Sequence, residues 1–513
     1  MRKECAKKGM WCYTVLVEVI TTMYKYNLLF AALVLLASCA SVQSINTPLE
    51  DFVYRQDEGW SYVLQSQFSG PGYTAYVLNF TSLNWLEFPK TNKPRWWHFL
   101  TVCVPTFVTS NTGFLYVDNG NYASAPPTVL HPLIQSVCLA SRSVVSHLAQ
   151  NPNQPLILDN DNKSRSEDAI IGYTWKKFLE NTTDYDWLGQ FPETKATVRA
   201  FDCISKFMKD SFPPWFPKVK SFVVSGASKR GWASWLAAAV DPRVKAVIPV
   251  VMPILDLVKN CENHYKAYGG WSYAYYNYYG EGVMAYMGTP QFDAMAKEID
   301  PINWVDQLLV PKYIVTAVGD QFFIPDSSAF FFHKLLGAKH QRIHPGADHS
   351  LLQRWSQFIQ EVTTYYNMVI NRQSLPDFEW SVIPDIVSNT TAITIVTDKR
   401  DCPSSVLLYT ADTISTTKRD WRQLLAPNVP QNITWAITPL SPYSDSNVFK
   451  TVISAPPAGG WRGAFVELTY DSPFGEQKYT TEFFYAPYTF PFETCAGAEY
   501  NNKYKYVLIS KGD

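Results

Sequence analysis

The sequence has no excess of charge of one sign, no metal-binding Cys/His pattern and few long apolar runs, and each of these would indicate a class of function. Its 44 Lys and Arg residues nearly balance 45 Asp and Glu residues, the formal net charge is −1, and no long run of one charge occurs. Nucleic-acid partners are therefore not expected, because proteins that bind them neutralise phosphates with clustered Lys and Arg. No CxxC pair or Cys/His cluster indicates zinc, and we predict neither a metal nor a cofactor.

Long apolar runs are also missing, with one short exception near the N-terminus. Residues 28–37 are apolar, follow Lys25 and precede small residues at cleavage-like spacing, which is typical of a secretory signal peptide. The run is roughly half of the ~20 residues that cross a bilayer, so no stable membrane anchor is expected. We interpret residues 1–44 as an N-terminal extension and signal peptide, with Met23 as a sensible start. The mature protein is then expected to be secreted and extracellular.

Two further patterns bear on the compartment. The letters LASC at residues 36–39 resemble the lipobox of bacterial lipoproteins, and chance accounts for them equally well. Asn-x-Ser/Thr sequons favour a eukaryotic secreted glycoprotein instead, although a chain rich in Asn, Ser and Thr also produces several by chance. The five sequons lie at Asn79, Asn162, Asn181, Asn389 and Asn432.

Cysteine is sparse, with six residues after position 44. An even number permits disulfides, but this density is far too low for a disulfide scaffold. If any pair forms a bridge, Cys402 with Cys495 is our first choice, because both fall in the C-terminal region.

The middle of the chain alternates short apolar runs with helix-like segments. Runs such as SFVVSG, KAVIPVVMP and KYIVTAVGD are continuous and β-branched, as in strands buried on both faces of a parallel sheet. Helical patterns lie between such runs, including residues 133–150 and 194–210. We therefore predict an α/β fold in which a mostly parallel sheet is flanked by crossover helices.

Beyond about residue 375 the pattern changes to alternation of apolar and polar residues. Segments such as AITIVTD and GAFVELTY are separated by Pro, Gly, Asn and Asp, which predicts antiparallel strands in a small immunoglobulin-like β-sandwich. Because 513 residues exceed the usual size of one core, we expect two domains. The α/β domain should span residues 45–372 and the β-rich domain residues 373–513, with the letters NRQSLPD as the linker.

The segment FVVSGASKRGWASW could be a nucleophile elbow, in which a strand, a sharp turn and a helix expose a serine, here Ser228. The GxSxG pattern becomes GxSxxG in this chain, because the second glycine is delayed to Gly231. An ordinary turn in which Ser225 or Ser228 caps the helix explains the motif about equally well.

A serine hydrolase of this kind needs an acid and a histidine downstream, each after a strand. Asp320 directly follows KYIVTAVG, and His349 lies in the loop HPGADHSL. We prefer this pair to Asp326 and His344, because Asp320 is at the strand end and a Gly turn precedes His349. In this hypothesis the histidine takes the serine proton, and the carboxylate fixes its tautomer.

An oxyanion hole would complete the site. One backbone N–H should come from Lys229, next to the nucleophile, and another from the loop LYVDNGNY, where Gly120 or Asn121 is the candidate. A simple polar turn is an equally good interpretation of that loop.

At these residues the chain resembles the PhoPQ-activated pathogenicity-related protein family, which includes autocrine proliferation repressor proteins. The resemblance covers most of residues 50–500 and rests on several motifs in the same order: PNQPL, EDAIIGYTW, TKATVRAFD, GASKRGW, DPRVKAVIPVV and GDQFFIPDSS. It implies an α/β-hydrolase fold related to serine peptidases and esterases, with Ser228, Asp320 and His349 as the matching triad. It also implies that some members act as secreted signals that restrain proliferation.

Two functions therefore compete. The first is a secreted serine hydrolase acting on a peptide or ester substrate through Ser228. The second is an extracellular autocrine signal that binds a cell-surface receptor and represses proliferation, with or without catalysis. Lys229 and Arg230 could attract an anionic substrate group, but we favour solvated positions for both. The tyrosine-rich segment 264–282 could line a pocket, but we favour aromatic packing of a cap.

Overall fold

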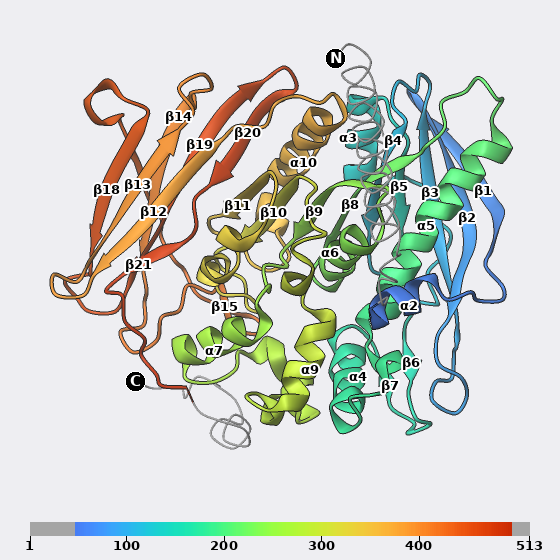
Figure 1. Ribbon diagram of the computed structural model, residues 1–513, viewed down its shortest axis with the longest axis horizontal. Coiled ribbons are helices and arrows are strands. Elements are labelled where there is room, and N and C mark those ends of the chain that lie inside the picture. Colours follow the sequence, from blue (N-terminus) through green and yellow to red (C-terminus); the bar gives the residue numbers. More distant parts are fainter. Residues whose placement is uncertain (1–46, 495–513) are drawn as a thin grey trace, which may run out of the picture. The chain divides into compact units, whose positions relative to one another are not determined.

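A computed structural model describes residues 47–494, apart from the side chain of Asp445, and the predicted signal peptide lies outside the described residues. Within this range, no helix combines the length and the apolar character required to cross a membrane. The central feature is a 14-stranded mixed sheet (Figure 1). Its strands, in spatial order, are β1 (Ser61–Gly70), β2 (Tyr73–Asn84), β3 (Arg95–Pro105), β5 (Val145–Leu148), β4 (Thr112–Val117), β8 (Ser221–Ala227), β9 (Val244–Val250), β10 (Lys312–Ala317), β11 (Lys339–His344), β20 (Gly475–Thr480), β19 (Arg462–Ser472), β14 (Ser405–Asp412) and β17 (Ala436–Pro439), with β21 (Phe484–Ala486) also paired to β19.

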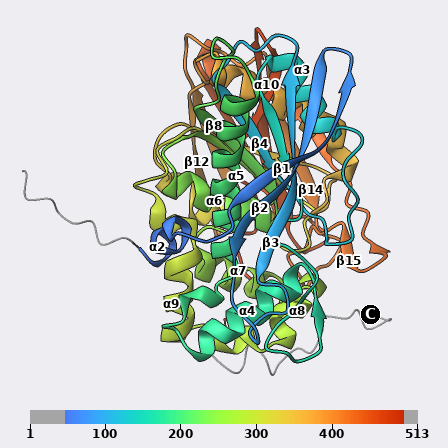
Figure 2. The same cartoon turned by 90° about the vertical axis from the view of Figure 1, so that its right-hand side faces the viewer.

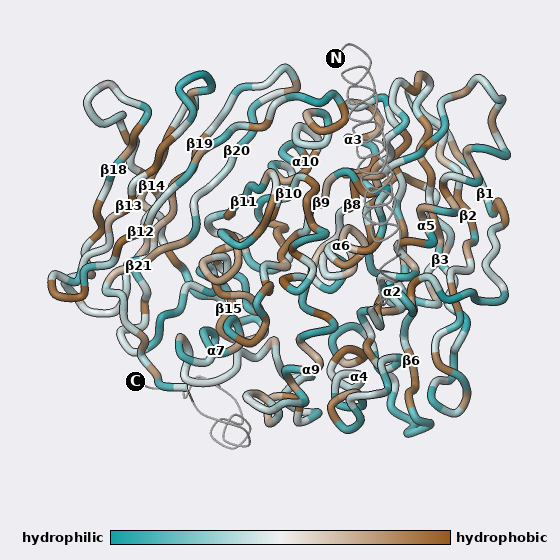
Figure 3. Tube along the Cα trace, viewed as in Figure 1, coloured by the Kyte–Doolittle hydropathy of each residue, from teal (hydrophilic) through white to brown (hydrophobic). Residues whose placement is uncertain are grey.

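The strands from β5 to β11 run parallel, and they form the centre of the sheet. The side chains of β8, β9 and β10 are buried on both faces, and these three strands contain brown stretches in Figure 3. On β8, Val224 belongs to the core on one face, whereas the next residue back, Val223, belongs to the core on the other. The prediction that the continuous apolar runs form strands buried on both faces of a parallel sheet is therefore confirmed.

Helices cover both faces of the sheet (Figure 2). On one face α5 (Gln190–Ser211) packs against α6 (Lys229–Val240), and on the other α3 (Pro132–Ser141) packs against α10 (Trp355–Ile370). The fold is thus an α/β sheet of mostly parallel strands flanked by helices, as predicted. The remaining α-helices of the described residues are α2 (Pro48–Tyr54), α4 (Asp168–Glu180), α7 (Leu257–Tyr268), α8 (Tyr276–Gly280) and α9 (Pro290–Ile299).

The predicted helix over residues 133–150 is wrong in its second half. Helix α3 ends at Ser141, because Arg142 takes a left-handed conformation with φ of 52°, and residues 145–148 form strand β5. This strand lies between β3 and β4, where pairing on both sides replaces helical hydrogen bonds.

The C-terminal region contains antiparallel strands, as predicted. One set is a separate three-stranded sheet of β12 (Phe378–Asp385), β13 (Thr390–Thr397) and β18 (Val448–Ser454). It packs against the second set, β14 and β19, through buried residues such as Ile395 and Leu468. The second set is continuous with the central sheet, because Gln341 on β11 pairs with Thr480 on β20. Two short strand pairs complete the β-structure of the described residues: β6 (Leu156–Ile157) with β7 (Ser164–Arg165), and β15 (Leu424–Ala426) with β16 (Val429–Pro430).

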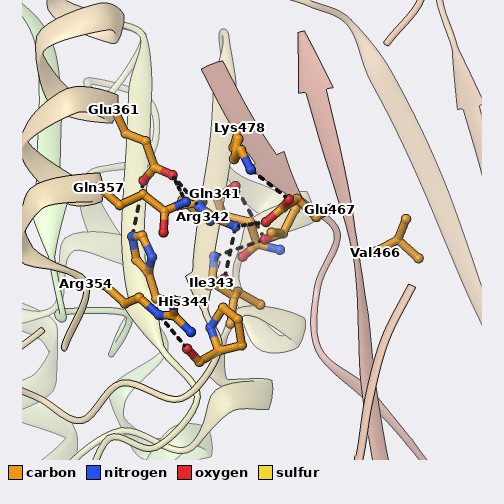
Figure 4. A network of polar contacts seen from close by, with 12 residues as sticks. Gln341, Arg342, Ile343, His344, Arg354, Gln357, Glu361, Val466, Glu467 and Lys478 are labelled. Atoms are coloured by element: carbon orange, nitrogen blue, oxygen red, sulfur yellow. Dashed lines mark hydrogen bonds and ion pairs between the residues drawn. The ribbon is translucent and has the colours of Figure 1, made fainter. Parts of the chain in front are cut away.

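A buried ion network joins the α/β and C-terminal regions (Figure 4). The guanidinium of Arg342 on β11 donates from Nε to Glu361 Oε1 on α10, at 2.9 Å, and from Nη1 to Glu467 Oε2 on β19, at 2.7 Å. Each of these three side chains is no more than 3% exposed. Burial alone would disfavour the charged guanidinium, but the two carboxylates outweigh it and raise the pKa of Arg342 above its ordinary value.

Candidate active site

Ser228 occupies a strained turn between strand β8 and helix α6. Its backbone has φ of 56° and ψ of −127°, a conformation that residues other than glycine rarely adopt. The Ser228 side chain does not cap the helix, and Ser225 is buried and donates to the Ile248 carbonyl at 2.7 Å instead. The helix-capping interpretation of this motif is therefore wrong, and the geometry is that of a nucleophile elbow.

Two glycines permit this turn because each lies very close to a backbone carbonyl. A Cβ atom on Gly226 would lie 2.6 Å from the carbonyl oxygen of Arg230, and one on Gly231 would lie 2.9 Å from the carbonyl oxygen of Gly226. Both contacts are with backbone and cannot be relieved by rotating a side chain. Gly231 thus supplies close approach one position later than in GxSxG, and Arg230 does not occupy the tight position.

Lys229 and Arg230 are not solvated, contrary to the sequence-based expectation. They are only 7% and 5% exposed, and both bind the carboxylate of Glu167. Arg230 does so with two parallel hydrogen bonds of 2.7 Å, and Lys229 Nζ lies 2.8 Å from Glu167 Oε2 and 3.3 Å from Asp168. Because both cations are paired inside the protein, they are not free to bind an anionic substrate group.

Glu167 is a structural residue of the site that sequence reasoning missed. Burial would raise the pKa of its carboxyl, but the hydrogen bonds and charges of Arg230 and Lys229 outweigh that effect and lower the pKa well below its usual range. Its carboxylate also accepts from Gln154 Nε2 at 2.6 Å, and Gln154 in turn donates to the Gly120 carbonyl. The acidic pair that opens the EDAIIGYTW motif was the available signal, since it immediately precedes a helix.

The structure brings Asp320 and His349 together. His349 Nδ1 lies 2.7 Å from Asp320 Oδ2, while Asp320 Oδ1 accepts the backbone N–H groups of Phe322 and Phe323 at 2.7 and 3.1 Å. The Asp320 side chain is 2% exposed and that of His349 is 14% exposed. A carboxylate held by three donors in this way fixes the orientation of the imidazole and leaves Nε2 as its outward nitrogen.

The imidazole ring of His349 packs against two phenylalanines that line the pocket of Ser228. The ring centroid of His349 is 4.6 Å from that of Phe322 and 5.7 Å from that of Phe323, and both phenylalanines line the same pocket as Ser228. Among the described residues, none forms a hydrogen bond with the Ser228 hydroxyl. Catalytic hydrogen bonds are often long before a substrate binds.

The two alternatives considered for the acid and the histidine have other partners. Asp326 is buried and accepts from Arg419 at 2.7 Å and from Asn263 at 3.0 Å. His344 is fully buried, and its Nε2 lies 3.2 Å from Glu361 within the network of Figure 4. Burial lowers the pKa of His344 despite this carboxylate. Both residues therefore stabilise the fold.

The predicted oxyanion loop adjoins the elbow. Strand β4 pairs with β8 so that Val117 is opposite Gly226, and the loop after β4 contains Gly120 at φ of 143°. The N–H of Asn121 already donates to Ser124 Oγ at 3.1 Å, which leaves Gly120 as the candidate donor on this loop. Lys229 is the first residue of α6, so its N–H has no partner one turn earlier in the helix.

An apolar pocket opens at Ser228. Apart from Asp168, Gln190, Ser228 and Lys229, every described residue that lines it is apolar or aromatic, and its free volume is about 30 Å³. Tyr275 and Tyr278 of the tyrosine-rich segment are among them, so this segment lines the pocket besides packing within itself. Within residues 47–494, no cluster of His, Cys, Asp and Glu is arranged to hold a metal ion.

A loop from the C-terminal region reaches the acid loop. The N–H of Gln423 donates to the Gly319 carbonyl at 2.9 Å, and the N–H of Gly319 donates to Ala347 at 2.9 Å. The backbone N–H of His349 in turn donates to Gln321 Oε1 at 3.2 Å. The loops that carry the acid and the histidine are therefore tied to each other and to the C-terminal region, a connection that sequence reasoning also missed.

The predicted modification sites differ in accessibility. Four sequon asparagines are exposed, whereas Asn79 is only partly exposed and lies within a strand paired on both sides. Cys402 is exposed, and Cys495 lies outside the described residues, so their bridge stays a prediction. The remaining cysteines of the described chain are buried free thiols at positions 103, 138, 203 and 261.

Comparison with known proteins identifies relatives over nearly the whole chain. Residues 49–422 match the model of the PhoPQ-activated pathogenicity-related protein family. Autocrine proliferation repressor protein A of Dictyostelium discoideum is 38% identical over 484 residues, covering 91% of this chain and 95% of the relative.

Solved structures with a similar fold include two bacterial esterases. Acetyl xylan esterase 1 from a Thermoanaerobacterium species has a TM-score of 0.40 and 16% identity, covering 60% of this chain and 87% of that one. An acetyl xylan esterase from a Paenibacillus species has a TM-score of 0.41 and 13% identity, covering 61% and 91%. Given the family match and the relative that spans almost its entire length, the chain belongs to the PhoPQ-activated pathogenicity-related protein family.

Proposed function

We propose that this protein is a secreted serine hydrolase that cleaves an ester or peptide bond through an acyl-enzyme on Ser228. The observation that carries the proposal is the combination of a strained, uncapped Ser228 with an Asp320–His349 pair whose ring packs on the wall of the same pocket. Backbone strain at a partly exposed serine is difficult to explain by folding alone, because it destabilises the native chain.

The proposed reaction assigns one role to each of these residues. Ser228 Oγ attacks the substrate carbonyl carbon while His349 Nε2 takes the hydroxyl proton, and Asp320 stabilises the resulting imidazolium. The oxyanion that forms faces the N–H groups proposed for the hole, Lys229 and Gly120. His349 then gives the proton to the leaving alcohol or amine, and a water molecule repeats the sequence to release the acid and restore Ser228.

A fluorophosphonate probe tests this proposal directly, because it forms a covalent bond with activated serines. We expect the full-length protein to be labelled and Ser228→Ala to lose labelling entirely. Ser350→Ala is the matched control: Ser350 is an exposed serine next to His349, and its removal should leave labelling intact. Labelling that survives in Ser228→Ala would refute Ser228 as the nucleophile, and no labelling of the wild-type protein would refute the hydrolase proposal.

A second candidate function is favoured by the name of the relative. Because a protein 38% identical over 91% of this chain is called an autocrine proliferation repressor, an extracellular signal that restrains proliferation through a cell-surface receptor is a specific alternative. The exposed sequons at Asn162, Asn181, Asn389 and Asn432 are compatible with such a secreted glycoprotein.

The two functions separate in one comparison. Purified wild-type protein and Ser228→Ala are added to proliferating cells at equal concentration, and cell number is followed. If only the wild type slows proliferation, signalling depends on hydrolysis. If both slow it equally while only the wild type reacts with the probe, the signal resides in the surface of the fold.

A further inference from the structure

The pocket beside Ser228 constrains the substrate's acyl group, the part that the proposed acyl-enzyme would retain. Its walls carry charges, but these are already paired within the protein. Lys229 Nζ contacts Glu167 and Asp168, and Asp168 Oδ1 also accepts the Tyr278 hydroxyl at 2.9 Å. A charged acyl group would lose its hydration there without gaining a free counter-charge, which is costly in an apolar setting.

Besides the Ser228 hydroxyl, one buried polar nitrogen of the described lining has no hydrogen-bond partner, and it is neutral. Gln190 is 2% exposed, and its Oε1 accepts from the Trp175 indole at 3.0 Å, an arrangement that fixes Nε2 as the unpaired amide nitrogen. A neutral N–H donor tolerates an uncharged group and cannot compensate a carboxylate as an ion pair would. The pocket therefore selects against charge of either sign.

The pocket is also narrow. Its free volume of about 30 Å³ is far smaller than the cavity of about 150 Å³ that holds a benzene molecule. The limiting walls include Trp175 and Trp232, both 4% exposed, whose rings pack edge to face at 5.6 Å. Hydrogen bonds from both indoles fix these walls, to Gln190 and to the Ile299 carbonyl. A ring or a long chain would have to displace large, anchored side chains.

We propose that the protein is selective for short, uncharged acyl groups of the size of acetyl or propionyl. This inference rests on the proposed hydrolase function and adds the substrate class to it. The acyl methyl group enters the apolar pocket, and the alcohol or amine leaves from the open side of Ser228. Met284 is the wall residue that best permits a test, because it is 2% exposed, flexible and lines the pocket.

The experiment uses the full-length protein and 4-nitrophenyl esters of acetate, propionate, hexanoate, decanoate, benzoate and hemisuccinate. We expect kcat/KM to fall at least about tenfold from propionate to hexanoate, and hydrolysis of benzoate and hemisuccinate to be slower still. Met284→Ala should move the preference towards hexanoate. Met295→Ala, which removes an equally buried methionine that does not line the pocket, should keep the wild-type order.

A second measurement does not depend on any pocket variant folding. Wild-type protein should react faster with an ethyl fluorophosphonate than with an octyl one. Equal rates for the two probes, a chain-length profile that is flat or rises towards decanoate, or a folded Met284→Ala with an unchanged profile would overturn the acyl-size inference alone. Complete absence of both ester hydrolysis and probe labelling would overturn the proposed function, and this inference with it.

Discussion

Asp320 and His349, which are 29 residues apart in the chain, meet through a 2.7 Å hydrogen bond between Oδ2 and Nδ1. Further hydrogen bonds hold both partners in place. Two backbone N–H groups donate to the other carboxylate oxygen of Asp320, and the Gln321 side chain accepts the backbone N–H of His349. An acid–histidine pair fixed by this many local bonds is suited to hold one tautomer of the imidazole.

Replacing the acid by its amide tests this role. Asp320→Asn keeps the size of the side chain but stabilises the wrong tautomer of His349, and we expect kcat on a 4-nitrophenyl ester to fall by about 10⁴-fold. Asp348→Asn is the control, because Asp348 precedes His349 in the loop after β11 and its carboxylate accepts from Ser350 and Gln353 instead of from the histidine. Comparable losses in both variants would contradict the assigned role of Asp320.

The close packing of Gly226 in the elbow predicts that no side chain is tolerated there. Gly226→Ala places a Cβ 2.6 Å from the Arg230 carbonyl oxygen, and we expect the free energy of unfolding to fall by about 1–3 kcal/mol. Labelling of Ser228 should fall with it, because the turn must shift. Gly280→Ala is the matched control, since a Cβ there meets no atom within 4 Å. Urea unfolding measures both variants, and equal stability of the two would show that the turn is not tightly packed.

The ion pairs of Glu167 with Lys229 and Arg230 predict that removing this carboxylate destabilises the fold. Glu167→Gln leaves Arg230 and Lys229 buried without their main counter-charge, and we expect a loss of about 1–3 kcal/mol in the free energy of unfolding at neutral pH. Glu180→Gln removes a more exposed carboxylate that pairs with Lys177, and it should change stability little. If Glu167→Gln is as stable as the wild type, the two cations have adequate partners elsewhere.

The elbow and the order of acid and histidine could be predicted because each depends on a local pattern. A strand, a glycine, a serine and a helix follow one another within residues 221–240, and Asp320 directly follows a strand end. Strand β5 could not be predicted in the same way. Its four residues continue the apolar pattern of helix α3, and only pairing with two distant strands makes them extended.

Burial of Lys229 and Arg230 could not be predicted because their partner is remote. Glu167 is more than 60 residues away in the chain. It reaches the elbow because it is the N-cap residue of helix α4, and the start of that helix lies next to the elbow. The continuity of the sheet into the C-terminal region is similarly hidden, since it depends on the pairing of β11 with β20. Alternation of apolar residues predicts that a strand forms, but it does not identify the neighbour of that strand.

Stability should depend on pH through Glu193, a buried residue in the first turn of α5 whose carboxylate oxygens have no partner. Burial raises the pKa of Glu193 from 4.5 to about 8, so the folded protein binds a proton that the unfolded chain releases above about pH 4.5. The stabilising contribution is complete below pH 4.5 and is lost as the pH rises through 8.

Glu193→Gln isolates this effect, because glutamine is neutral at every pH. We expect the variant to gain on the wild type between pH 5 and 9, by on the order of 2–4 kcal/mol at the upper end. Urea unfolding across this range provides the measurement, and Glu58→Gln at an exposed site is the control. Stability curves for Glu193→Gln and the wild type that stay parallel from pH 5 to 9 would show that Glu193 does not bind the extra proton.

The α/β region should not fold when residues after 372 are removed. Its strand β11 would lose β20 and become an exposed edge, and Arg342 would lose the Glu467 carboxylate. Asp326 would keep its buried charge without Arg419, a loss that typically costs about 3–5 kcal/mol by itself. We therefore expect a 45–372 fragment to be insoluble or readily proteolysed, whereas a 45–513 chain resists protease. A soluble, protease-resistant 45–372 fragment that reacts with a fluorophosphonate probe would instead establish residues 45–372 as an independent domain.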